Sequence, residues 1–343
     1  MSLRASPRLL LIGLIGLTLL SLWLSLALGP LRLPLGETLR ALAHLSGLPV
    51  TASDQALLVV GQIRLPRTLM GLMVGAVLAL TGVAMQGLFR NPLADPGLIG
   101  VSSGAALGAA LAIVGGEYLF ILPIGLQPYL LSLFAFMGGL VITAIVYRLG
   151  CRHGQAHVAT MLLAGIALTA MAGAAIGLLT YLADDTTLRL LTSWNLGSLN
   201  GASYARLWPL VGIGLAVALW LPRRADALNA LLLGESEARH LGIDVERLKG
   251  ELILCTALGV GAAVAAAGLI GFVGLVVPHL LRLITGPDHR VLLPSALFGG
   301  ASLLLLADII ARLLLAPAEL PIGIVTALIG APFFLFLLLR RAM

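Results

Sequence analysis

Long apolar runs without a charged residue constrain this chain more than any other feature. A helix needs about 20 residues to cross the roughly 30 Å hydrocarbon core of a bilayer, and many of the runs approach or exceed that length. Only 10% of the residues are charged, against about 25% in a soluble domain. The runs do not alternate polar and apolar residues, which excludes a membrane β-barrel. The pattern predicts an all-α, multi-pass membrane protein. The runs cover residues 9–28, 68–89, 98–116, 129–147, 158–183, 207–222, 252–281, 291–307 and 320–339.

The run at 252–281 is longer than one span requires. It forms either one tilted helix or two shorter helices, with breaks at its glycines or at Pro278 and an end near Gly286. Ten helices place about twice as many Lys and Arg residues inside as outside, whereas nine divide them almost evenly. The cytoplasmic preference of these residues therefore predicts ten spanning helices with both termini in the cytoplasm. The first span is too long for a signal peptide and is expected to be retained.

The chain is expected to form one membrane domain over residues 1–343. Its parts are a first helix with an external loop (1–57), helices two to six (58–222), a polar cytoplasmic segment (223–250) and helices seven to ten (251–343).

Several classes of function are excluded by the charged residues. The 21 Lys and Arg residues lie singly or in pairs between apolar runs, which is typical of membrane topology and not of nucleic-acid binding. Lys249 is the only lysine, and because Gly250 follows it the chain has no phosphate-binding P-loop. No catalytic residues are therefore predicted. Cys151 and Cys255 are expected to have packing roles, with neither a disulfide nor a metal.

An ion-driven transporter requires ionisable groups near the membrane midplane. None of the expected spans has a charged residue at its centre. Asp308 lies near the outer end of its helix, one turn before Arg312, and we expect the two to pair. His279 is expected to make a helix-to-helix hydrogen bond. The energy for transport is therefore expected to come from a separate cytoplasmic ATPase.

The cytoplasmic segment 225–249 reads as two short helices broken at Gly234 and Gly242. Leu228, Leu231 and Leu232 are expected to form an apolar contact face for a partner. A helix lying on the lipid is the alternative, but the acidic residues of this segment disfavour an anionic membrane surface.

Three arginines break the positive-inside pattern on the outer face: Arg64 and Arg67 at the start of helix two, and Arg312 at the end of helix nine. They are expected either to meet carboxylates of a partner or solute, or to anchor the chain at the lipid surface. The residues alone favour neither reading.

Six stretches carry a family resemblance. They are GQIRLPRTL at 61–69, QGLFRNPLADPGLIGVSSGA at 86–105, GFVGLVVPHLLR at 271–282, DHR at 288–290, ADIIAR at 307–312 and ELPIGIVT at 319–326. In this order they resemble the permease subunits of ABC importers for iron-siderophores, haem and cobalamin, also known as type II importers. The resemblance runs from about residue 58 to the C-terminus.

The resemblance implies a ten-helix subunit in the bacterial inner membrane that pairs with a second copy around a central pathway. Two ATPase subunits would bind below, and a periplasmic binding protein above. It also implies that Arg64, Arg67 and Arg312 receive glutamates of that binding protein. ATP and magnesium would belong to the ATPase subunits, and no cofactor or metal is expected to be permanently bound.

The resemblance further assigns the two cytoplasmic features. The inner gate would consist of Asn91, Leu93, Val158, Ala159 and Leu163. Residues that contact the ATPase would lie in the segment 225–249, and they are Leu228, Leu231, Leu232, Gly234, Glu235, Ala238, Arg239, Leu241 and Gly242.

The substrate is expected to be haem. Residues 180–199 look most like haem permeases, and the start of helix five lacks the polar Ser and Thr pattern of cobalamin permeases. A ferric siderophore is the first alternative, and cobalamin the second. A proton-coupled carrier or channel is the alternative from another class, and a membrane subunit that transports nothing is a third.

Overall fold

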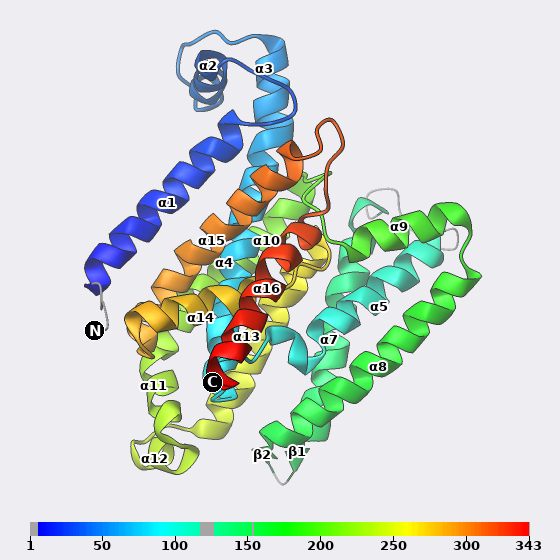
Figure 1. Cartoon of the computed structure of the whole chain (residues 1–343). Coiled ribbons are helices and arrows are strands. Elements are labelled where there is room, and N and C mark those ends of the chain that lie inside the picture. Colours follow the sequence, from blue (N-terminus) through cyan, green and yellow to red (C-terminus); the bar gives the residue numbers. More distant parts are fainter. Residues whose placement is uncertain (1–5, 117–126, 153, 343) are drawn as a thin grey trace.

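The computed structural model describes residues 6–116, 127–152 and 154–342. These residues form a bundle of tilted helices with a single short hairpin (Figure 1). The elements are α1 (Pro7–Ala27), α2 (Leu35–Leu45), α3 (Asp54–Leu58), the π-helical turn η1 (Val59–Arg64), α4 (Leu65–Leu88), η2 (Pro96–Ile99), α5 (Val101–Val114), α7 (Gln127–Gly150), β1 (Cys151–Arg152), β2 (Gln155–Ala156), α8 (Val158–Leu182), α9 (Asp185–Asn195), α10 (Tyr204–Trp220), η3 (Leu221–Arg224), α11 (Ala225–Leu233), α12 (Glu235–His240), α13 (Val245–Ala267), α14 (Val273–Thr285), α15 (His289–Leu313) and α16 (Ile322–Ala342).

In the described part of the chain, seven helices are long and apolar enough to cross a membrane. Three further apolar helices are shorter: α5, α14 and the part of α16 at Ile322–Phe336. Figure 1 shows α2 at one end of the bundle and α12 with the β1–β2 hairpin at the other. We call these the α2 end and the α12 end.

Helix α4 is the centre of the fold. It packs against α15, α13, α10 and α14. In the continuous helix Asp54–Leu88, which contains α4, 83% of the most apolar stretch of 18 residues is buried. Glycines permit the closest contacts, because a Cβ added at Gly75 would lie 2.3 Å from the carbonyl oxygen of Gly300. Gly104 and Gly138 allow the same approach between α5 and α7. Small residues such as Gly75 and Gly104 therefore let the membrane helices approach to backbone contact.

The run at 252–281 forms two helices. Helix α13 ends at Ala267, and Gly268 follows with a φ of +71°, a conformation that suits glycine. A Cβ at Gly268 would also lie 2.5 Å from the carbonyl oxygen of Trp194. Helix α14 starts at Val273, and Pro278 lies inside it without ending it.

Three boundaries differ most from the expected ones. The continuous helix that contains α4 begins at Asp54 rather than at residue 68, and α13 begins at Val245 rather than at residue 252. Helix α15 continues to Leu313 rather than ending at residue 307. The segment between the first two expected spans, residues 29–67, therefore contains α2, α3 and the π-helical turn. The expected spans stopped at the first charged residue, but here the charged side chains are paired inside the protein and the helices continue through them.

Candidate functional site

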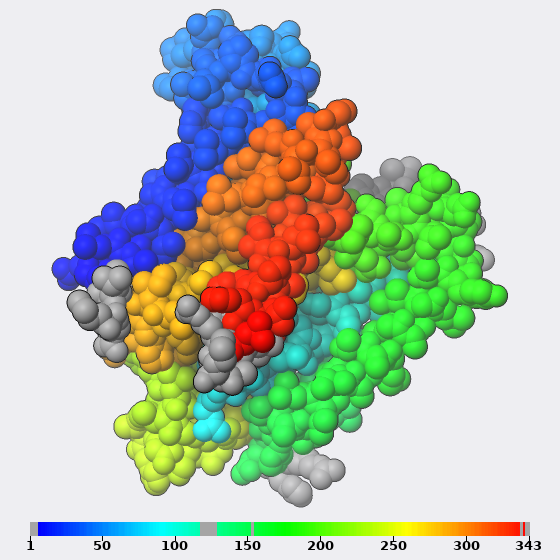
Figure 2. Space-filling model, viewed as in Figure 1, coloured from blue at the N-terminus to red at the C-terminus, as the bar shows by residue number. Residues whose placement is uncertain are grey.

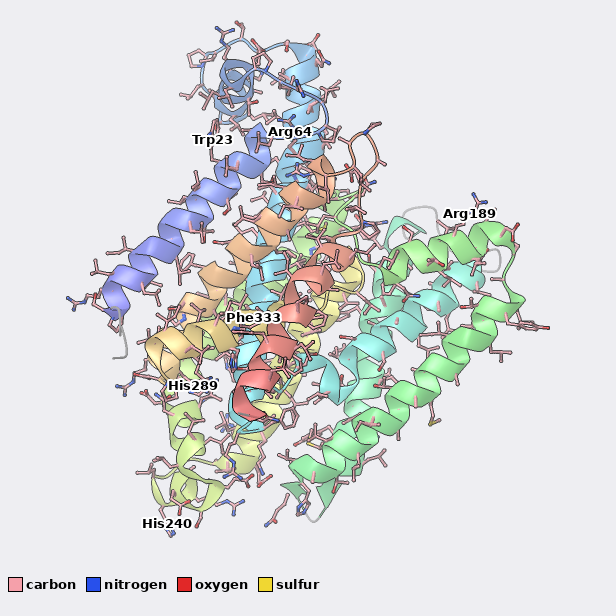
Figure 3. The ribbon with its side chains drawn as sticks, in the orientation of Figure 1. Trp23, Arg64, Arg189, His240, His289 and Phe333 are labelled. Atoms are coloured by element: carbon pink, nitrogen blue, oxygen red, sulfur yellow. The ribbon has the colours of Figure 1, made fainter. Side chains whose placement is uncertain are left out.

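Arg64 lies at the α2 end, where α1 and α4 approach each other (Figure 3). Its side chain is only 3% exposed. Its Nη1 donates to the carbonyl oxygens of Leu26 and Ala27, both at 2.8 Å, and its Nη2 donates to that of Leu31. The last carbonyls of a helix have no partner within the helix, so Arg64 caps α1 from outside. Gly29 makes this possible, because a Cβ there would lie 3.1 Å from the guanidinium.

Arg67 and Arg312 share one carboxylate between α4 and α15. Asp308 Oδ1 accepts hydrogen bonds from Arg67 Nε at 3.0 Å and Nη2 at 2.9 Å, while Asp308 Oδ2 lies 3.0 Å from Arg312 Nε. Arg67 Nη1 also donates to both oxygens of Glu319, and Arg312 Nη2 donates to Ser25 Oγ at 3.0 Å. The expected pairing of Asp308 with Arg312 is confirmed, and Arg67 is a second partner.

These contacts shield the arginine cluster, which consists of Arg67, Arg312, Asp308 and Glu319, from solvent. Arg67 and Arg312 are 5% and 3% exposed, and two carboxylates balance their two charges. Glu319 is the outermost member, with 24% of its side chain exposed. Sequence reasoning did not assign it a role, although it stands in the motif at 319–326. In this conformation the three arginines are structural groups rather than free surface cations.

The residues expected at the inner gate lie on two elements. Asn91 and Leu93 are in the turn after α4, where Asn91 Oδ1 accepts from the Leu93 amide at 3.0 Å. Val158, Ala159 and Leu163 are in the first turns of α8, and Leu163 is 69% exposed. The two regions come into contact just beyond these residues, between Leu98 of η2 and Gly165 of α8. A Cβ at Gly165 would lie 2.1 Å from the carbonyl oxygen of Leu98.

The segment 225–249 has the expected two helices. Gly234, with a φ of +133°, separates α11 from α12, and Gly242, with a φ of +82°, lies in the turn between α12 and α13. The expectation that Leu228, Leu231 and Leu232 form a face open to a partner is wrong. Leu228 and Leu231 are buried within the chain's own core, and Leu232 is half-buried. The large apolar side chains exposed here are Leu233 and Leu241. Ala238 is buried, Glu235 is half-buried and Arg239 is exposed.

Helix α11 is held against the membrane bundle by a polar junction with the start of α15. The Oδ1 of Asn229 accepts from the His289 amide at 2.9 Å and lies 2.8 Å from its Nδ1, and Asn229 Nδ2 donates to Asp288 at 2.7 Å. Gly87, near the end of α4, leaves room for the Leu228 and His289 side chains. This junction was not expected from the sequence.

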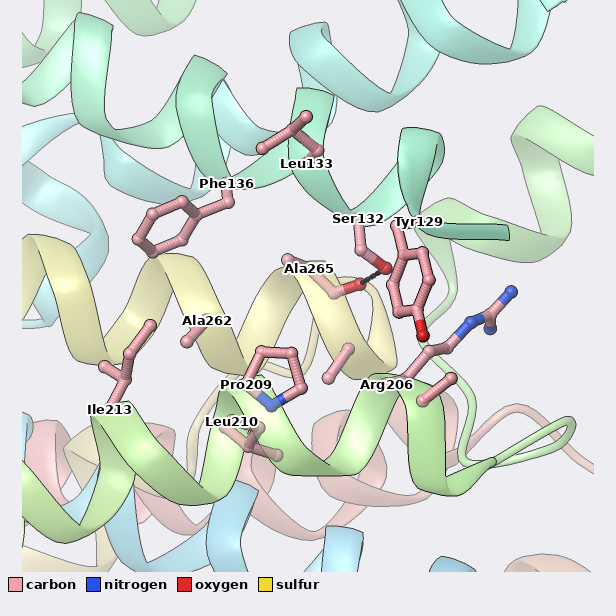
Figure 4. Close-up of a pocket in the computed structure, with 12 residues that line it drawn as sticks. Tyr129, Ser132, Leu133, Phe136, Arg206, Pro209, Leu210, Ile213, Ala262 and Ala265 are labelled. Atoms are coloured by element: carbon pink, nitrogen blue, oxygen red, sulfur yellow. Dashed lines mark hydrogen bonds between the residues drawn. The ribbon is translucent and has the colours of Figure 1, made fainter. Parts of the chain in front are cut away.

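Two of the pockets between the helices bear on the site. One, of about 210 Å³, is almost entirely apolar and lies between α7, α10 and α13, with Phe136 and Ile213 in its lining and Ser132 bonded to Ala265 beside it (Figure 4). The other, of about 220 Å³, lies between α4, the η2 region and the start of α14. Asp95 lines the second cavity and accepts from the Gly97 amide at 2.7 Å, so it caps the η2 turn. Within the described residues no group of three His, Cys, Asp or Glu side chains could hold a metal.

Comparisons with known proteins agree with this architecture. Residues 17–340 match the FecCD transport family. Over 284 residues the chain is 50% identical to the hemin transport system permease protein HmuU of Yersinia pestis, a match that covers 81% of this chain and 82% of that protein. Over 331 residues it is 44% identical to the vitamin B12 import system permease protein BtuC of Klebsiella pneumoniae, which covers 96% and 93%. A solved structure in an inward-facing conformation, assigned to the metal-chelate type of ABC transporters, aligns with a TM-score of 0.82 and 34% identity over 96% of this chain and 98% of that one. The chain therefore belongs to the FecCD transport family and is a multi-pass membrane permease of a bacterial ABC importer.

Proposed function

We propose that this chain is the permease subunit of a haem importer in the bacterial inner membrane. The observation that supports haem as the substrate is the 50% identity to a hemin permease, compared with 44% to a vitamin B12 permease. The apolar start of α8, with Val158, Ala159 and Leu163, supports a flat, largely apolar cargo over a cobalamin. A ferric siderophore is the next candidate.

The ten apolar helices α1, α4, α5, α7, α8, α10, α13, α14, α15 and α16 are the proposed spanning helices, with the α2 end toward the periplasm. Two copies of the chain enclose the pathway. Helix α8 supports the pairing, because it packs on α5 and α7 and leaves its other side open. Only 11% of its most apolar stretch of 18 residues is buried. Figure 2 shows it along one edge of the molecule with its outer side uncovered.

Two ATPase subunits bind at the α12 end and supply the energy through ATP and magnesium held on their own chains. The exposed part of the segment, including Arg239, Leu241 and Gly242, faces the partner. Leu228 and Leu231 act from inside: both are buried, and Leu228 packs against α4 at Gly87. The permease itself is neither an ATPase nor a permanent haem carrier: a weakly polar path releases its cargo, whereas tight ligation retains it.

A periplasmic binding protein docks at the α2 end by carboxylate exchange. One of its glutamates displaces Glu319, the most exposed member of the cluster, from Arg67. Further carboxylates of the binding protein bind Arg312, as its contact with Asp308 breaks, and Arg64, as its hydrogen bonds to the carbonyls of α1 break. Exchange of one charge-assisted pair for another keeps the buried charges of Arg67 and Arg312 balanced throughout.

Reconstitution into proteoliposomes tests this function. The permease is combined with its cognate ATPase subunit and with the binding protein loaded in turn with haem, a ferric siderophore or cobalamin. Haem uptake is expected, and it should require ATP and all three proteins. Uptake of only the siderophore or cobalamin would contradict the substrate. Uptake driven by a proton gradient without the ATPase subunit would instead support the carrier alternative.

A further inference from the structure

Lys249, the only lysine of the chain, is buried at the α12 end with 3% of its surface exposed. Its Nζ lies 2.8 Å from Glu235 Oε2 on α12, 3.0 Å from the carbonyl oxygen of Ala156 on β2 and 3.3 Å from Glu246 Oε1 on its own helix. An ammonium group has three N–H donors, so the three acceptors satisfy it completely. One side chain therefore joins α12, α13 and the β1–β2 hairpin.

The same group of residues holds both backbone polar groups of Ala156. Its carbonyl oxygen accepts from Lys249, and its amide donates to Glu246 Oε2 at 2.7 Å. Arg239 adds a bond to Glu246 at 3.0 Å and completes the charge balance with Glu235. We call Lys249, Glu235, Glu246 and the Ala156 backbone the lysine clamp. A buried charge that loses one partner is strongly unfavourable, so the clamp resists opening.

The clamp lies between two regions with proposed roles. Glu235 is the first residue of α12, in the segment that faces the ATPase subunits. Ala156 ends the hairpin that leads, two residues later, into the start of α8 and the proposed gate residues Val158 and Ala159. Because both backbone polar groups of Ala156 are bonded, the clamp links α12 directly to the start of α8.

We propose that Lys249 is a positioning residue that transmits the movement of the ATPase-contacting segment to the start of α8, and so to the inner gate. This inference rests on the proposed importer function. It assigns to the clamp a mechanical role that is separate from ATPase binding: without the clamp the ATPase subunits still bind and hydrolyse ATP, but the gate no longer follows them.

Lys249→Met tests the proposal in the complete complex, with Arg247→Met as the control. Arg247 lies two residues away and makes an exposed ion pair with Glu251. In proteoliposomes, the haem transported per ATP hydrolysed is expected to fall about tenfold in the complex that carries Lys249→Met and to stay unchanged in the control, as expected for loss of a coupling energy. A purely structural role would lower complex yield, hydrolysis and transport together and leave that ratio constant, and this outcome would overturn the proposal.

A measurement on the unaltered complex covers the case in which the variant does not fold. An amine-reactive label is applied to the resting and the nucleotide-trapped complex, and the labelled positions of the permease are mapped by mass spectrometry. Lys249 is expected to stay protected in both states, because the clamp moves without opening. Labelling of Lys249 in the trapped state would overturn the proposal. This measurement needs no substrate, so failure of the clamp is distinguished from failure of haem transport.

Discussion

Individual charged residues in this permease are matched to partners far away in the sequence. Arg67 on α4 is bonded to Asp308 and Glu319, more than 200 residues later. The motifs around these residues mark them as important, but a sequence does not say which acid faces which base. Glu319 illustrates this limit: its position in a family motif was visible, whereas its contact with Arg67 depends on how α4, α15 and the loop before α16 pack.

Glu319→Gln is expected to strengthen the binding protein's interaction with the permease. The amide leaves Arg67 with only one carboxylate, so an incoming glutamate no longer has to displace a charged competitor. The concentration of binding protein that gives half-maximal stimulation of ATP hydrolysis should fall severalfold. Glu37→Gln is the matched control, since its side chain at the same end of the molecule is 25% exposed, against 24% for Glu319. An equal change in both variants would count against carboxylate exchange.

Asp288 is expected to make the junction between α11 and α15 sensitive to acid. Hydrogen bonds from the Arg290 amide and the Asn229 side chain lower the pKa of Asp288 below its ordinary value. A depressed folded pKa contributes stability that is complete above the unfolded pKa and is lost as the pH falls through the folded one. Asp288→Asn should therefore lower the Tm of the detergent-solubilised protein at neutral pH, and the difference should narrow between about pH 5 and pH 3. A difference independent of pH would contradict this assignment.

Whole elements were predictable where apolar length and glycine position decide them. The break after α13 and the two short helices α11 and α12 follow from glycines at positions 268, 234 and 242. Helix ends at charged residues were not predictable, because Arg64, Arg67 and Arg312 are satisfied inside the protein. The direction of α11 was not predictable either: the apolar stripe with Leu228 indicates a buried face, but not whether the chain or a partner buries it.

Gly75→Ala should separate α4 from α15. Its Cβ would lie 2.3 Å from the Gly300 carbonyl oxygen and 2.9 Å from the Leu304 Cβ, so the two helices would have to move apart. Overpacking of this kind costs about 3 kcal/mol, and the Tm of the purified permease should fall clearly. Gly13→Ala is the control, because no neighbour lies within 4 Å of the added Cβ and alanine favours the helix. Equal melting of the two variants would mean that the helix contact is not tight in solution.

At the scale of the whole molecule, the side of the bundle formed by α8 leaves apolar surface uncovered. Membrane helices associate through small residues that allow close approach, and α8 carries Gly173 and Gly177 on a surface where the chain itself places nothing within 4 Å. The sequence showed these glycines, but only the fold shows that no other helix in the described part of the chain covers them. This supports the proposal that a second copy does.

Gly173→Leu is expected to weaken the pairing of two permease subunits. The added side chain would project from the open face of α8 and hold a second copy away. The fraction of dimer in detergent, measured by native mass spectrometry, should fall severalfold, with folding preserved. Gly13→Leu, on an open part of α1, is the control and should leave the dimer intact. If both variants remain fully dimeric, another face forms the interface.

The cap that Arg64 places on α1 has a consequence for biogenesis. Arg64 follows its acceptor carbonyls by 37 and 38 residues, so α1 leaves the ribosome well before the group that completes its end. Until Arg64 follows, only water at the membrane surface can pair with these carbonyls, so we expect the end of α1 to take its final geometry after residues 59–64 are in place. A chain truncated before Arg64 should therefore leave the last turn of α1 frayed.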